Sequence, residues 1–193
     1  FTDRRQRQMC IRDRLEGEPG TGRKTPDNRF TDTRNRRSIT PVSQAERFAM
    51  TRADFYILGG QADHDQWFFA CRLVEQIQQK GHKILLQVDN EQKARELDDM
   101  LWQFRADAFV PHALLTAKDA PVDCPVSIGW AQEPGHHHDV IINLSAELPA
   151  FFSRFERLVE IVVQKDDILA QTRQHFRFLK DRGYPVTHND MRM

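Results

Sequence analysis

The sequence has 193 residues, a mass of 22.6 kDa and equal numbers of basic and acidic residues, 28 of each. This length suits one domain with an additional segment, and the absence of any run of 18 apolar residues excludes a membrane span. No secretory signal pattern is present, and three cysteines (Cys10, Cys71 and Cys124) without metal-type spacing are too few for a disulfide framework. We therefore expect a cytoplasmic protein.

Residues 1–49 differ from the rest of the chain in charge and pattern. They hold twelve bases and seven acids, whereas residues 50–193 hold sixteen bases and twenty-one acids. Their apolar residues are scattered without periodicity, so the segment cannot bury enough surface to offset its ordering entropy, and we expect disorder. A basic arm that contacts nucleic acid is one interpretation. We favour translated upstream or artificial sequence, because the run from Met9 to Arg14 is adapter-like and Met50 directly precedes the first strand-like run.

From Met50 onward, strand-like and helix-like segments alternate. The first half predicts a strand at 54–58, a helix at 64–80 closed by Gly81, a strand at 83–88 and a helix at 91–105 capped by Asn90. Residues 109–115 are ambiguous. The second half predicts strands at 125–130 and 139–144, a helical turn at 151–155, a strand at 158–163 and a helix at 166–182 stopped by Gly183 and Pro185. This order predicts an α/β fold with a mostly parallel sheet flanked by helices.

Motifs for catalysis are missing from this region. Gly59-Gly60 follows the first strand, but no phosphate-loop pattern is present and the next residues are acidic, which favours a plain turn. Cys71 lies on an apolar helical stripe and is expected to be a buried thiol. His136–His138 have no carboxylate or cysteine at ligand spacing, so we expect no metal site. Asp98 and Asp99 are interpreted as members of an exposed helix face without a catalytic role.

Trp102 has an unusual place on the helix predicted at 91–105. The apolar stripe of this helix consists of Ala94, Leu97, Met100, Leu101 and Phe104. At about 100° per residue, Trp102 falls roughly 145° from the centre of that stripe, on the charged face. An exposed tryptophan is a preferred anchor at protein interfaces. Because large aromatic side chains are mostly buried, a neighbouring loop that covers Trp102 stays open as an alternative.

The last helix carries a basic stripe beside its apolar side. The apolar side consists of Ile168, Leu169, Thr172, Phe176 and Leu179. Arg173, Arg177 and Lys180 lie next to it, at i, i+4 and i+7. Such a stripe beside Phe176 suits a ligand with acidic and apolar parts. From the residues alone, a solvated face with bases near the helix C-terminus is an equally good interpretation.

Several segments together match one known family in the same order along residues 50–188. They are DFYIL near the start, ARELDDMLWQFRADAFVPHAL at 94–114, DVIINL at 139–144, and FFSRFERLVEIV followed by the RxxFRFLKDRGYP helix. They resemble the chi subunit of the bacterial DNA polymerase III holoenzyme. The most specific parts are Leu101-Trp102, the run Phe109-Val110-Pro111-His112, and the final helix with its Gly183 stop. Residues 1–49 have no counterpart in the family.

The resemblance implies a single Rossmann-like α/β domain over residues 50–193, without cofactor or catalytic site. It implies an accessory role in DNA replication within a DNA-directed DNA polymerase assembly. One surface of chi binds the psi subunit, which tethers it to the clamp loader. Another binds the acidic C-terminal tail of single-stranded DNA-binding protein, which ends in a phenylalanine carboxylate. Contact with DNA would be indirect, since residues 50–193 have a net charge of −5.

The resemblance also assigns residues to these two surfaces. Trp102 and Phe109 match the psi surface, and the tail site matches Val162, Arg173, Phe176, Arg177 and Lys180. The terminal carboxylate of the tail is expected to pair with Arg173, and its ring to enter a slot near Val162 and Phe176. Leu169 stands where some relatives carry a base, and Phe176 where they carry tyrosine. We therefore expect weaker polar anchoring of the tail, without loss of the site.

Two other functions remain open from the sequence. A nucleotide-dependent enzyme on a Rossmann-like sheet is the main alternative, and the missing phosphate loop counts against it. A DNA-binding variant that uses the basic residues 1–49 is the second alternative.

Overall fold

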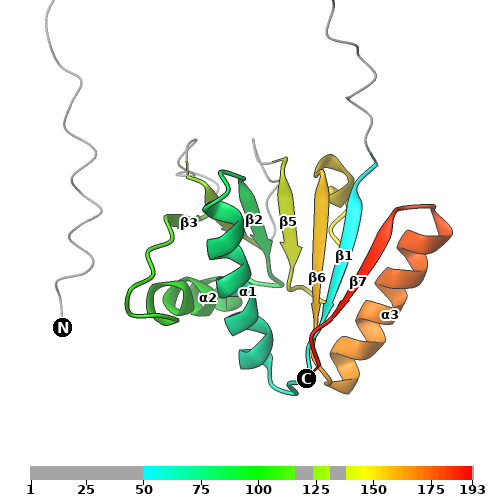
Figure 1. Cartoon of the computed structure of the whole chain (residues 1–193), viewed down its shortest axis with the longest axis horizontal. Coiled ribbons are helices and arrows are strands. Elements are labelled where there is room, and N and C mark those ends of the chain that lie inside the picture. Colours follow the sequence, from blue (N-terminus) through cyan, green and yellow to red (C-terminus); the bar gives the residue numbers. More distant parts are fainter. Residues whose placement is uncertain (1–49, 116–123, 131–137, 193) are drawn as a thin grey trace, which may run out of the picture. The chain divides into compact units, whose positions relative to one another are not determined.

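A computed structural model gives the fold, and it describes residues 50–115, 124–130 and 138–192 (Figure 1). The elements are β1 (Arg52–Ile57), α1 (Asp63–Gln78), β2 (Ile84–Gln87), α2 (Glu91–Gln103), β3 (His112–Leu114), β4 (Val126–Gly129), β5 (Val140–Asn143), a short 3₁₀ turn (Phe152–Arg154), β6 (Arg157–Val162), α3 (Asp166–Asp181) and β7 (Val186–Asp190). The strands form one sheet in the order β3-β4-β2-β5-β6-β1-β7, and each described pair is parallel. The predicted α/β fold with a parallel sheet is confirmed.

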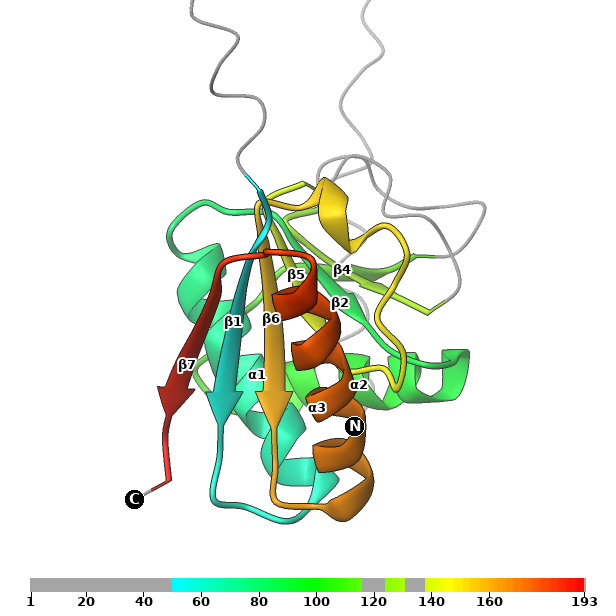
Figure 2. The ribbon, with the colours of Figure 1, turned by 90° about the vertical axis from the view of Figure 1, so that its right-hand side faces the viewer.

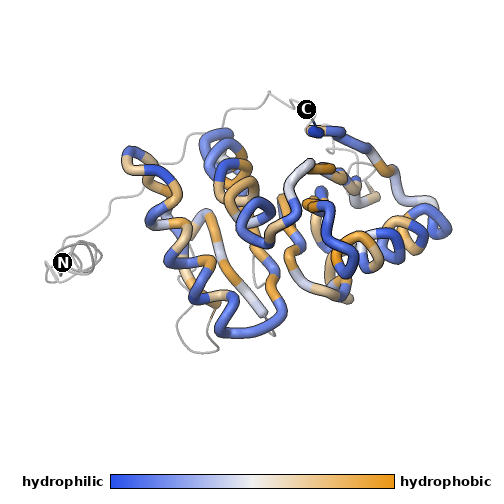
Figure 3. Tube along the Cα trace, turned by 90° about the horizontal axis from the view of Figure 1, so that it is seen from below, coloured by the Kyte–Doolittle hydropathy of each residue, from blue (hydrophilic) through white to orange (hydrophobic). Residues whose placement is uncertain are grey.

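The helices cover both faces of the sheet. α1 and α2 pack on one face and α3 on the other, as Figures 1 and 2 show from two sides. Successive strand side chains point to opposite faces, so Val159 and Ile161 of β6 pack under α1 and α2, whereas Leu158 and Val162 pack under α3. The helices alternate between hydrophobic and hydrophilic residues along their length (Figure 3), as amphipathic helices on a sheet should.

The structure confirms the helix cap and the helix stops that were predicted from the sequence. The side chain of Asn90 accepts a hydrogen bond of 2.9 Å from the backbone N–H of Lys93 and so caps α2. Gly81 and Gly183 have φ angles of +84° and +78°, a backbone region that L side chains adopt at a cost, directly after α1 and α3. These glycines end the two helices as predicted.

Two strands differ from the expectation. The ambiguous segment 109–115 contains the short strand β3. The C-terminal strand β7 was not predicted, because its residues Val186–Asp190 show no apolar alternation and are mostly exposed. β7 pairs in parallel with β1, with Phe55 opposite His188, and forms an edge of the sheet.

Within the described ranges, no helix combines the length and apolar character that a membrane span requires. The expectations for residues 1–49 and for His136 and His137 lie outside these ranges.

Candidate functional site

An apolar pocket lies between α3 and the end of the sheet formed by β6, β1 and β7. Its volume is about 260 Å³. The residues that line it are Phe55, Ile57, Val162, Gln164, Leu169, Thr172, Arg173, Phe176, His188 and Arg192. Figure 2 shows α3 next to β6, with β1 and then β7 following β6 across the sheet. The pocket therefore depends on β7, the strand that the sequence analysis missed.

Strand register and ring packing shape this pocket. β1 pairs with both neighbours, so Ile57 lies opposite Val162 on β6 and Phe55 lies opposite His188 on β7. The ring of Phe176 on α3 then packs edge-on against Phe55, with centroids 5.7 Å apart, and against His188 at 5.1 Å. Three elements thus hold Phe176 in one place as a wall of the pocket.

The two arginines that line this pocket differ in their partners. Arg192 is held by Asp190, with an Nη2–Oδ2 distance of 2.6 Å, and this pairing lowers the pKa of Asp190 to about 2. Arg173 on α3 is exposed and makes no ion pair with any residue in the described ranges. A carboxylate that enters the pocket therefore finds its unneutralised cation at Arg173.

The structure brings together most of the residues assigned to the tail site. Val162, Arg173 and Phe176 line the pocket directly. The ammonium group of Lys180 lies 5.7 Å from the centre of the Phe176 ring, at the distance of a cation–π contact. Arg177 is exposed on α3 and does not line the pocket. His188 and Arg192 were missed, since recognising them requires β7.

A buried ion pair fixes α3 to the sheet beneath the basic stripe. Nδ1 of His175 lies 3.1 Å from Oε1 of Glu160 on β6, and the side-chain amide of Asn143 donates to the same oxygen at 3.0 Å. Burial alone would lower the pKa of His175. The hydrogen bond and charge of Glu160, with a backbone contact to Ala146, outweigh burial and raise that pKa above its ordinary value.

A second surface is formed by Trp102 and Phe109, here called the aromatic pair. Their ring centroids are 5.9 Å apart, and the turn after α2 brings them together. Trp102 is half-buried, whereas Phe109 is 70% exposed, the most exposed of the large hydrophobic side chains described. The segment that follows α2 therefore covers Trp102 in part, as the alternative of a neighbouring loop predicted, and the role of Trp102 as an interface anchor stays a prediction.

Asp98 is not simply part of an exposed helix face. Its Oδ1 lies 3.2 Å from Nε2 of His112, a fully buried side chain on β3. The His112 ring also contacts Trp102, with centroids 4.8 Å apart. Asp98 thus connects α2 to the strand beside the aromatic pair, a role that sequence spacing alone does not reveal.

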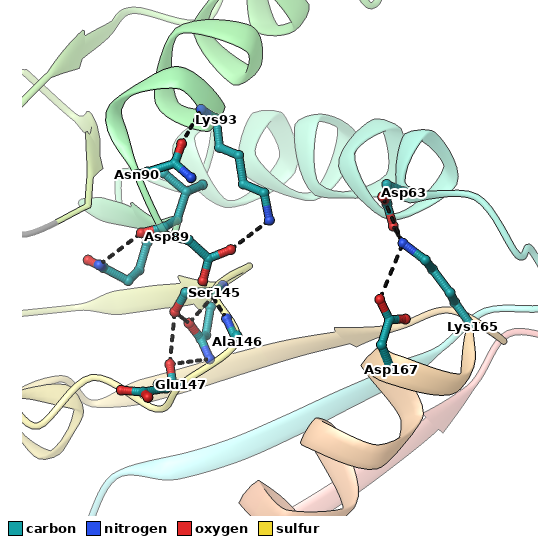
Figure 4. Close-up of polar contacts among 12 residues, drawn as sticks. Asp63, Asp89, Asn90, Lys93, Ser145, Ala146, Glu147, Lys165 and Asp167 are labelled. Atoms are coloured by element: carbon teal, nitrogen blue, oxygen red, sulfur yellow. Dashed lines mark hydrogen bonds and ion pairs between the residues drawn. The ribbon is translucent and has the colours of Figure 1, made fainter.

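A small polar crevice of about 120 Å³ lies at the carboxyl ends of β2, β5 and β6. In Rossmann-like folds this edge, near helix N-termini, is where phosphate groups bind. In this chain, the lysine side chains near the crevice form ion pairs with aspartates of the same chain (Figure 4). Lys165 pairs with Asp63 at 3.0 Å and with Asp167 at 3.4 Å, and Lys93 pairs with Asp89 at 2.6 Å. An added phosphate would meet these acids.

Cys71 and a metal cluster are the remaining candidates for chemistry that the sequence raised. Burial raises the pKa of the Cys71 thiol to about 12, so this cysteine is not a nucleophile at neutral pH. Within residues 50–115, 124–130 and 138–192, no three His, Cys, Asp or Glu side chains gather as a metal site would require.

Comparison with known proteins shows the family of this chain. The family described as DNA polymerase III chi subunit, HolC, matches residues 50–187. The chain is 39% identical over 137 residues to DNA polymerase III subunit chi of Pseudomonas aeruginosa, which covers 71% of this chain and 94% of that protein. It is 31% identical to the chi subunit of Haemophilus influenzae over 136 residues (70% and 94%), and 27% identical to that of Escherichia coli over 141 residues (70% and 95%). The chain belongs to the DNA polymerase III chi subunit family, whose members are accessory subunits of a polymerase assembly in DNA replication.

Proposed function

We propose that this chi subunit is a non-catalytic adaptor that joins psi, and through psi the clamp loader, to the C-terminal tail of single-stranded DNA-binding protein. The observation that carries the proposal is the apolar pocket with the unneutralised Arg173 at its wall. An acidic peptide that ends in phenylalanine has the two groups that such a pocket recognises, an aromatic ring and a carboxylate.

The size of the pocket favours a side chain over a cofactor. Its volume of about 260 Å³ is below the roughly 300–1,000 Å³ of most small-molecule sites. The terminal ring of the tail would pack against Val162 and Phe176, while its carboxylate pairs with Arg173. Arg177 and Lys180 lie outside the pocket on the same helix, where they would steer the acidic residues that precede the terminal ring.

The placement of the two surfaces supports a bridging role. The aromatic pair lies beside β3 at one edge of the sheet, and the apolar pocket lies beside β7 at the other edge. Psi bound at the aromatic pair would therefore leave the pocket free. Many tails on DNA coated with single-stranded DNA-binding protein would raise the effective concentration, so a weak contact at each pocket can suffice.

Fluorescence anisotropy with a labelled acidic peptide that ends in phenylalanine tests the tail site. We expect Arg173→Ala to weaken binding about 10–100-fold, the equivalent of one charge-assisted hydrogen-bonded pair. Removal of the terminal phenylalanine should have an effect at least as large, and added salt should weaken binding by the native chain. Arg72→Ala, an exposed arginine on α1, is the matched control. Equal binding by native protein and Arg173→Ala would refute the site.

Copurification with psi tests the aromatic pair. Trp102→Ala and Phe109→Ala should each release psi, because aromatic anchors dominate interface energy. Phe178→Ala is the matched control, since Phe178 is an exposed aromatic residue on α3, which covers the face of the sheet opposite α2. Retention of psi by both variants would contradict this part of the proposal.

The alternative of a nucleotide-dependent enzyme has a simple test. Lys93 and Lys165 are already neutralised by Asp89, Asp63 and Asp167, so millimolar ATP or NAD should not raise the melting temperature of the full chain. A rise would support the enzyme and count against the adaptor.

A further inference from the structure

His112 lies buried directly behind the aromatic pair, and the proposed function gives it no role. Its side chain is fully buried at the start of β3, and its ring lies against Trp102 with centroids 4.8 Å apart. Phe109 contacts the same indole at 5.9 Å. Trp102 thus lies between a buried imidazole and the exposed ring of Phe109.

Both nitrogens of this imidazole face oxygen acceptors. Nδ1 lies 2.7 Å from the carbonyl oxygen of Val110, and Nε2 lies 3.2 Å from Oδ1 of Asp98 on α2. The second contact is within ion-pair distance, although it is out of line for a hydrogen bond. A neutral imidazole has one N–H, so one nitrogen would present a lone pair to an oxygen in a buried place. In the imidazolium ion, Nδ1 donates to the Val110 carbonyl and the positive charge lies within ion-pair distance of the Asp98 carboxylate.

We infer that His112 is a positioning residue for the aromatic pair: as an imidazolium ion it joins α2 to the segment that carries Phe109 and holds Trp102 in its binding orientation. The charge also favours the contact with the indole, because a cation near a tryptophan ring is attracted to its π-system. This inference rests on the proposed role of the aromatic pair as the psi surface.

The charges around His112 favour the protonated form. Among the described residues, Asp98 is the acidic residue that pairs with it. The arginines nearby on or after α2 are engaged elsewhere, Arg95 with Glu91 and Arg105 with Glu75. On the neighbouring strand β4, the residue opposite His112 is the apolar Val126.

The direction of the pKa shift agrees with this geometry. Burial alone would lower the pKa of His112, but the contacts with Asp98 and with the Val110 carbonyl outweigh burial and raise it above 6.5. Psi should therefore bind more tightly at pH 6 than at pH 8, if the imidazolium ion holds the indole in place.

Tryptophan emission of the full chain tests the positioning directly, without psi. Replacing Trp67 and Trp130 by phenylalanine leaves Trp102 as the reporter, and an imidazolium ion quenches a neighbouring indole more than neutral imidazole does. We expect the emission to rise with pH around a midpoint above 6.5, the midpoint to fall in Asp98→Asn, and the titration to vanish in His112→Asn. A midpoint at or below 6.5, or one that Asp98→Asn leaves unchanged, would overturn the inference. The chain that carries only Trp67→Phe and Trp130→Phe gives the first result, so a poorly folded Asp98→Asn or His112→Asn variant does not prevent the test.

Titration with psi completes the test. His112→Asn should weaken psi binding about tenfold at pH 6 and make it independent of pH, while tail-peptide binding stays unchanged. If psi binds equally well to the native chain and His112→Asn at all pH values, the positioning role is wrong and the adaptor stands. If the emission titrates as expected but psi does not bind, the proposed psi surface is wrong, and the orientation of Trp102 by His112 stands.

Discussion

Two buried histidines each lie beside a carboxylate from another element. His175 meets Glu160 beneath α3, and His112 meets Asp98 beneath the aromatic pair. The sequence could supply the apolar stripe of α3 and the exposed bases, since these follow from helical spacing. It could not supply the ion pairs, because each joins residues on separate elements whose contact depends on the assembled sheet.

The His175–Glu160 pair should make stability depend on pH. The ordinary pKa of 6.5 applies to His175 in the unfolded chain, and its partners raise the pKa in the folded chain. The protonated ring therefore stabilises the fold fully below pH 6.5, and this contribution is lost as the pH rises through the higher folded value. We expect the free energy of unfolding in urea to decline between about pH 6 and pH 8.

Glu160→Gln identifies the source of this decline. The substitution removes the charge that holds the proton on His175 while it keeps the side-chain volume, so the slope of stability against pH should become shallower. His112 adds a contribution of the same sign, and Asp98→Asn should remove that part. An unchanged slope in Glu160→Gln would show that the ion pair does not favour the protonated histidine.

At the scale of elements, the helices were predictable and the edge strands were not. α1, α2 and α3 follow from apolar stripes and from stops at Gly81 and Gly183, and the structure confirms them within a few residues. β7 has no such signal, because an edge strand gains its hydrogen bonds from β1 while its side chains remain mostly exposed. Because β7 was not predicted, its pocket-lining residue His188 was not predicted either.

The N-terminal cap of α2 should contribute measurably to the free energy of unfolding. Asn90→Ala removes the acceptor for the backbone N–H of Lys93 and should lower the free energy of unfolding by about 1 kcal/mol. Asn90→Asp should retain most of the stability, because a carboxylate caps equally well. Gln92 is exposed and lies two residues after Asn90. Gln92→Ala should change the free energy of unfolding by less than about 0.5 kcal/mol. Equal losses for Ala and Asp would argue against capping.

The packing of α3 on the sheet depends on Leu179. This side chain is fully buried among Phe55, Leu158 and other residues on the face opposite α1. Leu179→Ala should lower the free energy of unfolding by about 2–5 kcal/mol through lost burial and a cavity. Gln174→Ala, exposed on the same helix, is the control and should cost less than about 0.5 kcal/mol. Similar effects of the two substitutions in chemical denaturation would mean that α3 is not anchored at Leu179.

At the scale of the whole molecule, residues 50–193 should suffice for the adaptor. The family match begins at residue 50, and these residues carry a net charge of −5, which disfavours direct contact with DNA. We expect deletion of residues 1–49 to leave the melting temperature, the affinity for the tail peptide and any retention on single-stranded DNA unchanged. Loss of DNA retention after this deletion would instead favour a basic arm that binds nucleic acid.

The strand order also predicts the order in which strand pairs form during folding. β2 pairs with β4 and β5, whose paired residues lie 42 and 56 positions further along the chain, whereas β1 pairs with β6 and β7, whose paired residues lie 105 and 133 positions further along. Thr51 and Phe155, which hydrogen bond at the start of β1, are 104 residues apart. Because distant contacts carry the larger loop-closure entropy, pulse-labelled hydrogen exchange during refolding should protect β2, β4 and β5 before β1 and β7.

Simultaneous protection of all strands in one phase would contradict this order. If it holds, the half of the molecule that carries the aromatic pair matures first, and the apolar pocket closes last, when β7 joins β1. Under the proposed function, a newly made chain would then be able to bind psi before it is able to bind a tail, so assembly with the polymerase would precede recruitment to coated DNA.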